Sequence, residues 1–306
     1  MTKETFQVVS AYDGTKLDAL CFLPEGKPKG IFQILHGMCE YKERYQPFMC
    51  FLAEHGYIAA AHAHRGHGNS VSDKSDLGYF SDKTGKAVTE DAFAVTQALK
   101  KRYGDLPVIL FGHSMGSLVA MNYLQKHETA IEKLVICGMP KKNIFVGVGL
   151  FLNGVISLFK GERHRSKWMA KLTLGGANKK FKSDGKNAWL TRDREVVKAY
   201  NADEKCNFIF TCNGFKNLLK LLKNTYKQTK YRRFYPTLPI LFVAGEEDPV
   251  AGGFDGWFEG KYMLTERGYV RVYGQLYQGM RHEILNEIGK EKPYADILAF
   301  CNTEIL

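Results

Sequence analysis

Short runs of apolar residues recur along the chain and predict the strands of a mainly parallel β-sheet. Strands of a parallel sheet are covered on both faces, so they read as continuous apolar runs instead of an alternating pattern. Five runs fit this description: Gly30–Leu35, Pro107–Phe111, Leu134–Cys137, Pro239–Ala244 and Tyr269–Tyr273. The opening segment Thr5–Leu23 predicts two more strands joined by a turn at Asp13-Gly14, and we expect this hairpin at an edge of the sheet.

Apolar residues at helical spacing lie between these runs. They are found in Tyr45–His55, in Thr84–Tyr103 and in Ser117–Gln125. Strands that alternate with helices predict an α/β fold, with a mostly parallel central sheet flanked by helices.

The strand pattern is interrupted between Gly138 and Leu238. Because this stretch is rich in charge and in helix formers, we predict a helical cap over residues 141–235, inserted between two parts of one core, residues 1–140 and 236–306. Its segment Ile144–Phe159 is almost wholly apolar. A helix of that length reaches about 24 Å, less than the ~30 Å of a bilayer's hydrocarbon core. We favour a lid over an apolar pocket and keep a helix lying in the membrane surface as the alternative.

Basic residues are concentrated in the predicted cap. The 306-residue chain has a net charge of +11, but residues 141–235 hold 22 Lys and Arg against 6 Asp and Glu, so the rest of the chain is acidic. A basic region attracts nucleic acid, an anionic membrane or an acidic substrate. The sequence has no nucleic-acid-binding signature, so we expect no nucleic acid partner. Peripheral contact of the cap with an anionic membrane and a merely solvated lysine-rich face both stay open, as does the oligomeric state.

The cysteines and the first residues favour a cytoplasmic protein. Seven cysteines are scattered along the chain without CxxC pairs or zinc-like spacing, so we expect free thiols. The opening residues MTKET lack the basic and then apolar pattern of a secretory signal.

The sequence GHSMG, residues 112–116, is the strongest chemical signal. It places Ser114 between two glycines, after a predicted strand and before a predicted helix. Glycines at these positions allow the tight strand-to-helix turn that lifts a nucleophilic serine above a sheet. The alternative is a serine that only caps the following helix. The surrounding pattern favours the nucleophile.

A serine nucleophile needs a general base and an acid that orients the base, and in this architecture the chain order is serine, acid, histidine. Three histidines follow Ser114. His127 and His164 lie in charged segments and are expected to be solvated. His282 follows the last predicted strand by a loop and is the predicted base.

The acid is expected at the end of a strand between Ser114 and His282. Asp248 meets this condition, and Pro249 would fix the turn after it. Asp255 is the fallback. The adjacent Glu246 and Glu247 are expected to be solvated.

Acyl transfer also needs backbone N–H groups aimed at the developing oxyanion. One is expected from Met115, directly after the serine, and the other from Met38, which follows His36-Gly37 in the loop after the first parallel strand.

The loop AHAHRGHGNS, residues 61–70, invites a metal interpretation because it holds His62, His64 and His67. No carboxylate stands within it, so we predict no metal. Arg65 and His67 are expected to hydrogen-bond loops beneath the candidate site.

Taken together, the motifs resemble the monoacylglycerol lipase and lysophospholipase branch of the α/β-hydrolases, which is sometimes grouped with serine aminopeptidases. The resemblance rests on HGM with Glu40 and Arg44-Tyr45, and on HRGHGNS, GHSMGS, AGEEDPV and RHEILNE. It implies an α/β-hydrolase fold with a mobile helical cap, cleavage of one acyl chain from glycerol or a glycerophospholipid, and no cofactor. It assigns the nucleophile to Ser114, the acid to Asp248, the base to His282 and the oxyanion donors to Met38 and Met115. The loop HGMCEYKERY departs from many relatives, which carry a second glycine and a histidine near Cys39 and Tyr41.

The leading prediction is therefore a serine hydrolase that cleaves a monoacylglycerol or lysophospholipid ester through an acyl-enzyme on Ser114. Two alternatives stay open. A peptidase that removes N-terminal residues would use the same triad, with an acidic group in the cap to bind the free amine; the basic cap argues against it. A non-catalytic protein on the same fold would hold an apolar ligand, and the complete triad argues against it.

Overall fold

The computed structural model describes residues 1–227 and 230–303. Residues 228–229 of the predicted cap and 304–306 of the predicted second core segment lie outside the described residues. The described strands form one sheet in the order β1-β2-β4-β3-β5-β6-β7-β8. They are β1 (Thr2–Val9), β2 (Lys16–Leu23), β3 (Gly30–Leu35), β4 (Tyr57–His62), β5 (Val108–His113), β6 (Lys133–Cys137), β7 (Ile240–Gly245) and β8 (Val272–Tyr277). β2 pairs antiparallel with both neighbours and every other pair is parallel. The predicted edge hairpin and the predicted fold class are confirmed.

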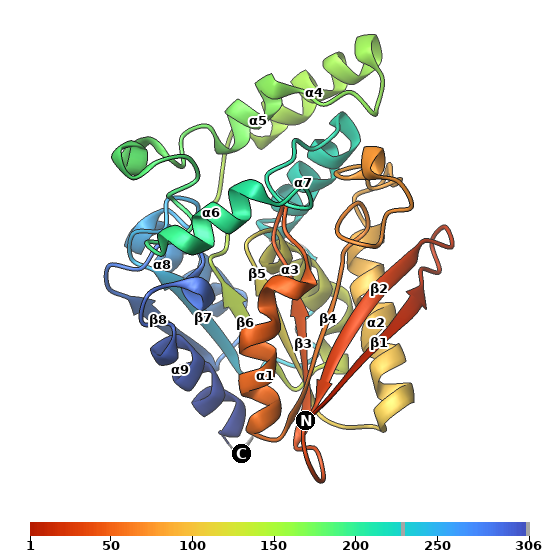
Figure 1. Ribbon diagram of the computed structural model, residues 1–306, viewed down its shortest axis with the longest axis vertical. Helices are drawn as coiled ribbons and strands as arrows, with labels where there is room; N and C mark the ends of the chain where they lie inside the picture. Colours follow the sequence, from red (N-terminus) through yellow and green to blue (C-terminus); the bar gives the residue numbers. More distant parts are fainter. Residues whose placement is uncertain (228–229, 304–306) are drawn as a thin grey trace.

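Helices cover both faces of the sheet (Figure 1). Buried residues of α1 (Gln46–Glu54) and α9 (Glu291–Asn302) pack on one face. Those of α2 (Ala87–Tyr103), α3 (Met115–His127) and α8 (Gly253–Glu266) pack on the other. The sequence pattern predicted α1, α2 and α3 to within a few residues, whereas α8 and α9 were not predicted.

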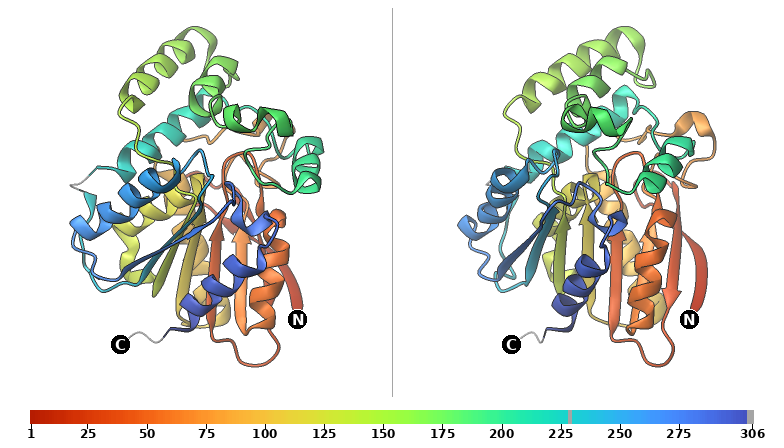
Figure 2. Two further views of the ribbon diagram at one scale, coloured as in Figure 1. Left: turned by 90° about the vertical axis from the view of Figure 1, so that its left-hand side faces the viewer. Right: turned by 60° about the vertical axis from the view of Figure 1, so that its left-hand side comes forward.

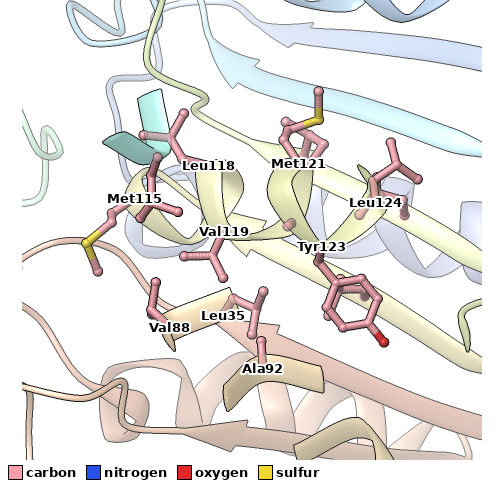
Figure 3. Close-up of a cluster of buried hydrophobic side chains, with 14 of the residues drawn as sticks. Leu35, Val88, Ala92, Met115, Leu118, Val119, Met121, Tyr123 and Leu124 are labelled. Atoms are coloured by element: carbon pink, nitrogen blue, oxygen red, sulfur yellow. The ribbon is translucent and has the colours of Figure 1, made fainter. Parts of the chain in front are cut away.

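The helix α3 lies in the centre of the larger hydrophobic core. Figure 3 shows its residue Val119 beside Leu35 of β3 and Ala92 of α2, and all three are fully buried. Because α3 is packed on every side, the turn that precedes it is held in a fixed position.

The described residues between β6 and β7 form the α-helices α4 (Val146–Lys160), α5 (Lys167–Leu174), α6 (Arg194–Ala202) and α7 (Cys212–Thr225). They gather above the carboxyl ends of the parallel strands, at the opposite end of the molecule from both termini (Figure 1). The predicted helix Ile144–Phe159 corresponds to α4. No helix in residues 1–227 or 230–303 is long and apolar enough to cross a bilayer. The boundaries of the cap at residues 141 and 235 stay a prediction.

The last strand differs from its prediction, because β8 spans Val272–Tyr277 and not Tyr269–Tyr273. Tyr269 is a core residue whose hydroxyl donates to the Glu128 carboxylate over 2.7 Å. β8 is an edge strand with mostly exposed or half-buried residues, so it lacks a continuous apolar run. Gly274 within it makes room for Trp257, because a Cβ there would lie 2.5 Å from the indole ring.

Candidate active site

Ser114 stands at the junction of β5 and α3 in a conformation that side chains rarely adopt, with φ 53° and ψ −118°. The two flanking glycines make this turn fit. A Cβ at Gly112 would lie 2.4 Å from the carbonyl oxygen of Gly116, and a Cβ at Gly116 would lie 2.0 Å from that of Leu35. Both contacts are far inside van der Waals distance, so only glycine lets β5, α3 and β3 come this close.

The side chain of Ser114 is free of the helix that it begins. Ser114 is the N-cap residue of α3, yet its hydroxyl makes no capping hydrogen bond. Its backbone N–H donates to the Cys137 carbonyl over 2.9 Å, which fixes the turn against β6. The alternative of a serine that only caps its helix is therefore wrong.

Asp248 and His282 form a buried hydrogen-bonded pair. The Nδ1 atom of His282 lies 2.8 Å from Oδ2 of Asp248, and both side chains are almost fully enclosed. The other carboxylate oxygen of Asp248 accepts the N–H groups of Val250 (2.8 Å) and Ala251 (3.1 Å) in the turn that contains Pro249. Because Nδ1 faces the carboxylate, Nε2 is the ring nitrogen left for other chemistry.

Glycines bring the loops of this pair together. A Cβ at Gly138 would lie 3.2 Å from Oδ2 of Asp248 and 3.3 Å from Nδ1 of His282. Gly138 has φ 55°, so both its space and its backbone favour glycine. At the end of β7, a Cβ at Gly245 would collide with the carbonyl oxygens of Met280 and Arg281.

The other acids and histidines weighed from the sequence lie elsewhere. Asp255 is exposed on α8, and Glu246 is exposed in its loop. The expectation that His127 is solvated is wrong: its ring stacks on Phe93 at 3.8 Å and contacts Glu90, because α3 packs against α2 there. His164 is half-buried.

Two residues beside Ser114 with unpaired backbone amides line a cavity. Met38 and Met115 both line it. The amides around them have partners, since Gly37 N–H donates to Glu40 over 2.5 Å and Cys39 N–H to His67 over 3.4 Å. No hydrogen bond within the described part of the chain uses the N–H of Met38 or of Met115.

A buried ionic network that the sequence did not predict joins the two loops at the site. Arg44 donates to Glu40 over 2.8 Å and makes two bonds of 2.7 Å to the carboxylate of Glu283, next to His282. His113 lies 3.1 Å from Glu40, and its Nε2 lies 3.2 Å from the His282 carbonyl. Burial raises the pKa of the Glu40 carboxyl, but His113 and Arg44 outweigh it and hold that pKa well below its usual range. Its members Glu40, Arg44 and Glu283 stand in segments that the family resemblance singled out, but no partners were assigned to them.

His36, directly after β3, His62, at the end of β4, and His64 form a cluster of fully buried rings. The ring of His36 lies 4.2 Å from that of His64, and the ring of His62 lies 4.8 Å from that of His64. Neither ring nitrogen of His62 or His64 has a hydrogen-bond partner. In residues 1–227 and 230–303, no group of three or more His, Cys, Asp or Glu side chains is arranged to hold a metal ion.

Of Arg65 and His67, which were both expected to support loops beneath the site, only His67 does so. His67 accepts the Cys39 amide, so it does support a loop at the site. Arg65 instead bonds Asp91 of α2 and Asp13 of the β1–β2 turn, at 2.6 and 3.0 Å, and so ties the edge hairpin to α2.

A cavity of about 1200 Å³ connects these features. Ser114 and His282 line its base, and apolar side chains of α4 and α7, among them Leu152, Leu218 and Leu222, line its upper part. The only carboxylates among its described lining residues are Glu40 and Glu283, both already paired with Arg44. Within the described residues Ser114 and His282 share no hydrogen bond, and hydrogen bonds between catalytic groups are often long until a substrate binds.

Comparisons with known proteins give one consistent picture. A family model described as serine aminopeptidase, S33, matches residues 26–289. The monoglyceride lipase of Homo sapiens is 31% identical over 90% of this chain and 82% of its own. The monoacylglycerol lipase of Mycolicibacterium smegmatis is 27% identical over 86% and 85%. Among solved structures, a thermostable carboxyl esterase from Bacillus coagulans in complex with glycerol superposes with a TM-score of 0.92 and 24% identity over 100% of both chains. This last likeness concerns the fold alone.

Proposed function

Because the chain belongs to the serine aminopeptidase S33 family of α/β-hydrolases and is similar to monoacylglycerol lipases, we propose that it cleaves carboxylic esters of single-chain lipids, monoacylglycerols or lysophospholipids, through an acyl-enzyme on Ser114. The observation that carries this proposal is the buried Asp248–His282 pair, which shares one cavity with the elbow serine.

The proposed reaction has two steps. In the first, Nε2 of His282 takes the proton of the Ser114 hydroxyl as its oxygen attacks the ester carbonyl, and the amides of Met38 and Met115 stabilise the oxyanion. The alcohol then leaves with the proton from His282. In the second step His282 activates a water molecule, which hydrolyses the acyl-enzyme and frees the fatty acid. Asp248 keeps the imidazole oriented and stabilises its cation throughout.

The cavity supports a substrate with one long acyl chain. Ligand cavities commonly measure about 300–1,000 Å³, and this cavity of about 1200 Å³ reaches from Ser114 to the apolar side chains between α4 and α7. A chain placed there would be removed from water along much of its length.

The peptidase alternative gains no support from the site. A peptidase that binds a free N-terminal amine needs an unpaired carboxylate near the serine. The cavity's described carboxylates are Glu40 and Glu283, and the Arg44 guanidinium neutralises both.

Replacement of the triad residues tests the proposal. We expect Ser114→Ala to lose about 10⁶-fold in kcat on a monoacylglycerol and to escape labelling by a fluorophosphonate. We expect Asp248→Asn to lose about 10⁴-fold, because the imidazole would be held in the wrong tautomer.

Asp255→Asn is the matched control, since Asp255 is the other candidate acid and is exposed on α8. It should keep normal kcat. Normal ester hydrolysis by Ser114→Ala would refute the mechanism, and preference for an aminoacyl amide over a monoacylglycerol would favour the peptidase. Labelling without turnover of any ester would favour the non-catalytic binding protein.

A further inference from the structure

The two edges of the sheet differ in how they are protected against another strand. β1 forms one edge, and its sequence TKETFQVV carries Lys3 and Glu4, of which Glu4 pairs with Arg102 at 2.8 Å. Charged side chains on an edge strand discourage pairing with another chain. β8 forms the other edge, and its sequence VYGQLY contains neither a charged residue nor a proline. The edge at β8 is therefore open to pairing.

The main chain of β8 is exposed at this edge. The left-hand view of Figure 2 faces it and shows α8 and α9 on either side of β8. Gly274 in the middle of the strand is exposed, and because glycine has no side chain, its exposed surface is main chain. The Ile240 N–H donates to the Arg271 carbonyl over 2.9 Å, which sets the pattern of the parallel β7–β8 ladder. In that pattern the main-chain groups of Val272, Gly274 and Leu276 point away from β7.

These outward-facing groups have little to bond within the chain. Among the described residues, their only hydrogen bond outside the ladder comes from the Gln275 side chain, whose Nε2 donates to the Leu276 carbonyl over 2.8 Å. The groups of Val272 and Gly274 are left to solvent. A row of unpaired main-chain groups on an edge strand is a template for another strand.

The sequence of β8 fits a second copy of itself. In an antiparallel pair centred on Gly274, this glycine faces its own copy, Val272 faces Leu276, and Tyr273 faces Gln275. Each outward-facing residue then meets another one, so every such pair can exchange both of its main-chain hydrogen bonds. Val272 and Leu276 share the face of Gly274 and are half-buried, so they form apolar contacts across the joint.

The helix α8 extends an apolar surface beside the same edge. Trp257 covers Gly274, since a Cβ at Gly274 would lie 2.5 Å from its indole ring. Phe254, Phe258 and Tyr262 continue from Trp257 as a stack whose neighbouring ring centroids lie 5.8 to 6.0 Å apart. The exposed fractions of these three side chains are 60%, 46% and 50%. Aromatic side chains are enriched at protein–protein interfaces, so this stack indicates that the edge is covered by protein.

We infer that two copies of this chain form a dimer in which their β8 strands pair antiparallel, centred on Gly274, and join the two eight-stranded sheets into one. The two-fold axis is perpendicular to the sheet, so the two α8 helices lie side by side on one face. The axis also reverses the strands, so the two caps and their cavities lie at opposite ends of the dimer. The inference concerns assembly alone and does not rest on the proposed function.

Charge substitutions at the two facing positions test both the pairing and its register. In sedimentation velocity, the full chain should behave as a dimer that dissociates on dilution. Tyr273→Lys with Gln275→Lys places lysine opposite lysine on both sides of the axis and should raise the dissociation constant about tenfold or more. Tyr273→Lys with Gln275→Glu places lysine opposite glutamate, and the dimer should return.

The same two substitutions on the other edge strand are the control. Thr5 and Gln7 of β1 are exposed at the same two-residue spacing, so Thr5→Lys with Gln7→Lys should leave the dissociation constant unchanged.

A second pair of variants compares two exposed apolar surfaces. Phe254→Gln with Phe258→Gln should weaken the dimer, because these rings lie beside the joint. Phe151→Gln with Leu158→Gln should not, although these two side chains of α4 are exposed by 69% and 80%.

Three results would overturn the inference. The first is a chain that stays monomeric at its highest soluble concentration. The second is a dimer that survives Tyr273→Lys with Gln275→Lys, and if the α4 pair dissociates that dimer, the copies meet at their caps instead. The third is a lysine–glutamate variant as monomeric as the lysine–lysine variant, because the pairing would then not be centred on Gly274. Hydrolysis of a soluble short-chain ester by the same variants reports on the proposed function alone, and we expect it to stay normal.

Discussion

At the scale of single residues, Ser114 shows how the backbone is bent to present one hydroxyl. A non-glycine residue at φ 53° costs of order 1–3 kcal/mol, and such strain persists only where the surroundings enforce it. Here the enforcement comes from the Cys137 carbonyl, which holds the Ser114 amide, and from the close approach of Gly112 and Gly116. In this turn the Ser114 hydroxyl makes no capping bond to α3, and the residue lines the cavity.

Replacement of Gly116 tests how tightly this turn is determined. In Gly116→Ala the new methyl group would lie 2.0 Å from the Leu35 carbonyl oxygen and 2.6 Å from that of His36. Both are backbone atoms within a sheet and its following loop, so they cannot move aside cheaply. We expect the free energy of unfolding, measured in urea, to fall by at least about 3 kcal/mol.

Gly147→Ala is the matched control, because Gly147 lies in α4 with no heavy atom within 4 Å of its missing Cβ. Alanine there should be neutral or stabilise the protein by up to about 1 kcal/mol. Equal stability of Gly116→Ala and the unaltered chain would contradict the geometry derived for the turn.

At the scale of elements, the end of β4 and the loop after it bury three histidines: His62 and His64, whose rings have no hydrogen-bond partner, and His67, which accepts the Cys39 amide. Burial lowers the pKa of His62 to about 3, and the pKa of His67 to about 4. In the unfolded chain these rings titrate near 6.5. Between the folded and unfolded values the unfolded state therefore binds more protons, so the stability that is fully present above pH 6.5 is lost as the pH falls toward 3–4.

His62→Phe should reduce this acid sensitivity. The phenyl ring replaces an imidazole whose two nitrogens have no partners, so we expect little change in stability at pH 7. At pH 4.5 the variant should be more stable than the unaltered chain by on the order of 2 kcal/mol, measured by urea unfolding across the pH range. His55→Phe is the control, since His55 is exposed, and it should leave the pH dependence unchanged. An unchanged acid slope in His62→Phe would show that the ring is hydrated when folded.

The apolar runs that the structure confirms as parallel strands are those buried along their whole length. β3, β5, β6 and β7 are buried at every residue, so their apolar runs are continuous. In β8 only the last residue, Tyr277, is buried, and the middle residues, Gly274 among them, are exposed. No apolar run therefore marks this strand. α9 carries apolar residues at helical spacing in Tyr294, Ile297 and Phe300, all of them buried.

At the scale of the whole molecule, the site is assembled from loops that follow β3, β5, β7 and β8. Chain order and local motif were enough to nominate Ser114, Asp248 and His282, because each follows a recognisable strand or loop. The bonds from Arg44 to Glu283 join residues 239 positions apart, and nothing local in the sequence encodes them. The substrate cavity is likewise a product of how α4, α5 and α7 sit over the sheet.

The uneven division of charge over the molecule gives a last prediction. Residues 141–235 carry a net +16 and the rest carries −5, so an anionic surface should attract the end of the molecule that bears α4. The Debye length falls from ~10 Å at 0.1 M salt to ~3 Å at 1 M. We expect binding to phosphatidylglycerol-containing vesicles to weaken more than about tenfold over that range. The kcat/KM on a soluble neutral ester should stay constant, because a neutral ester brings no net charge to the Asp248–His282 pair for salt to screen. If salt lowers both to the same degree, it acts on the folded site and not on vesicle binding. If it lowers neither, the apolar side chains of α4 hold the protein on lipid without help from the lysines around them.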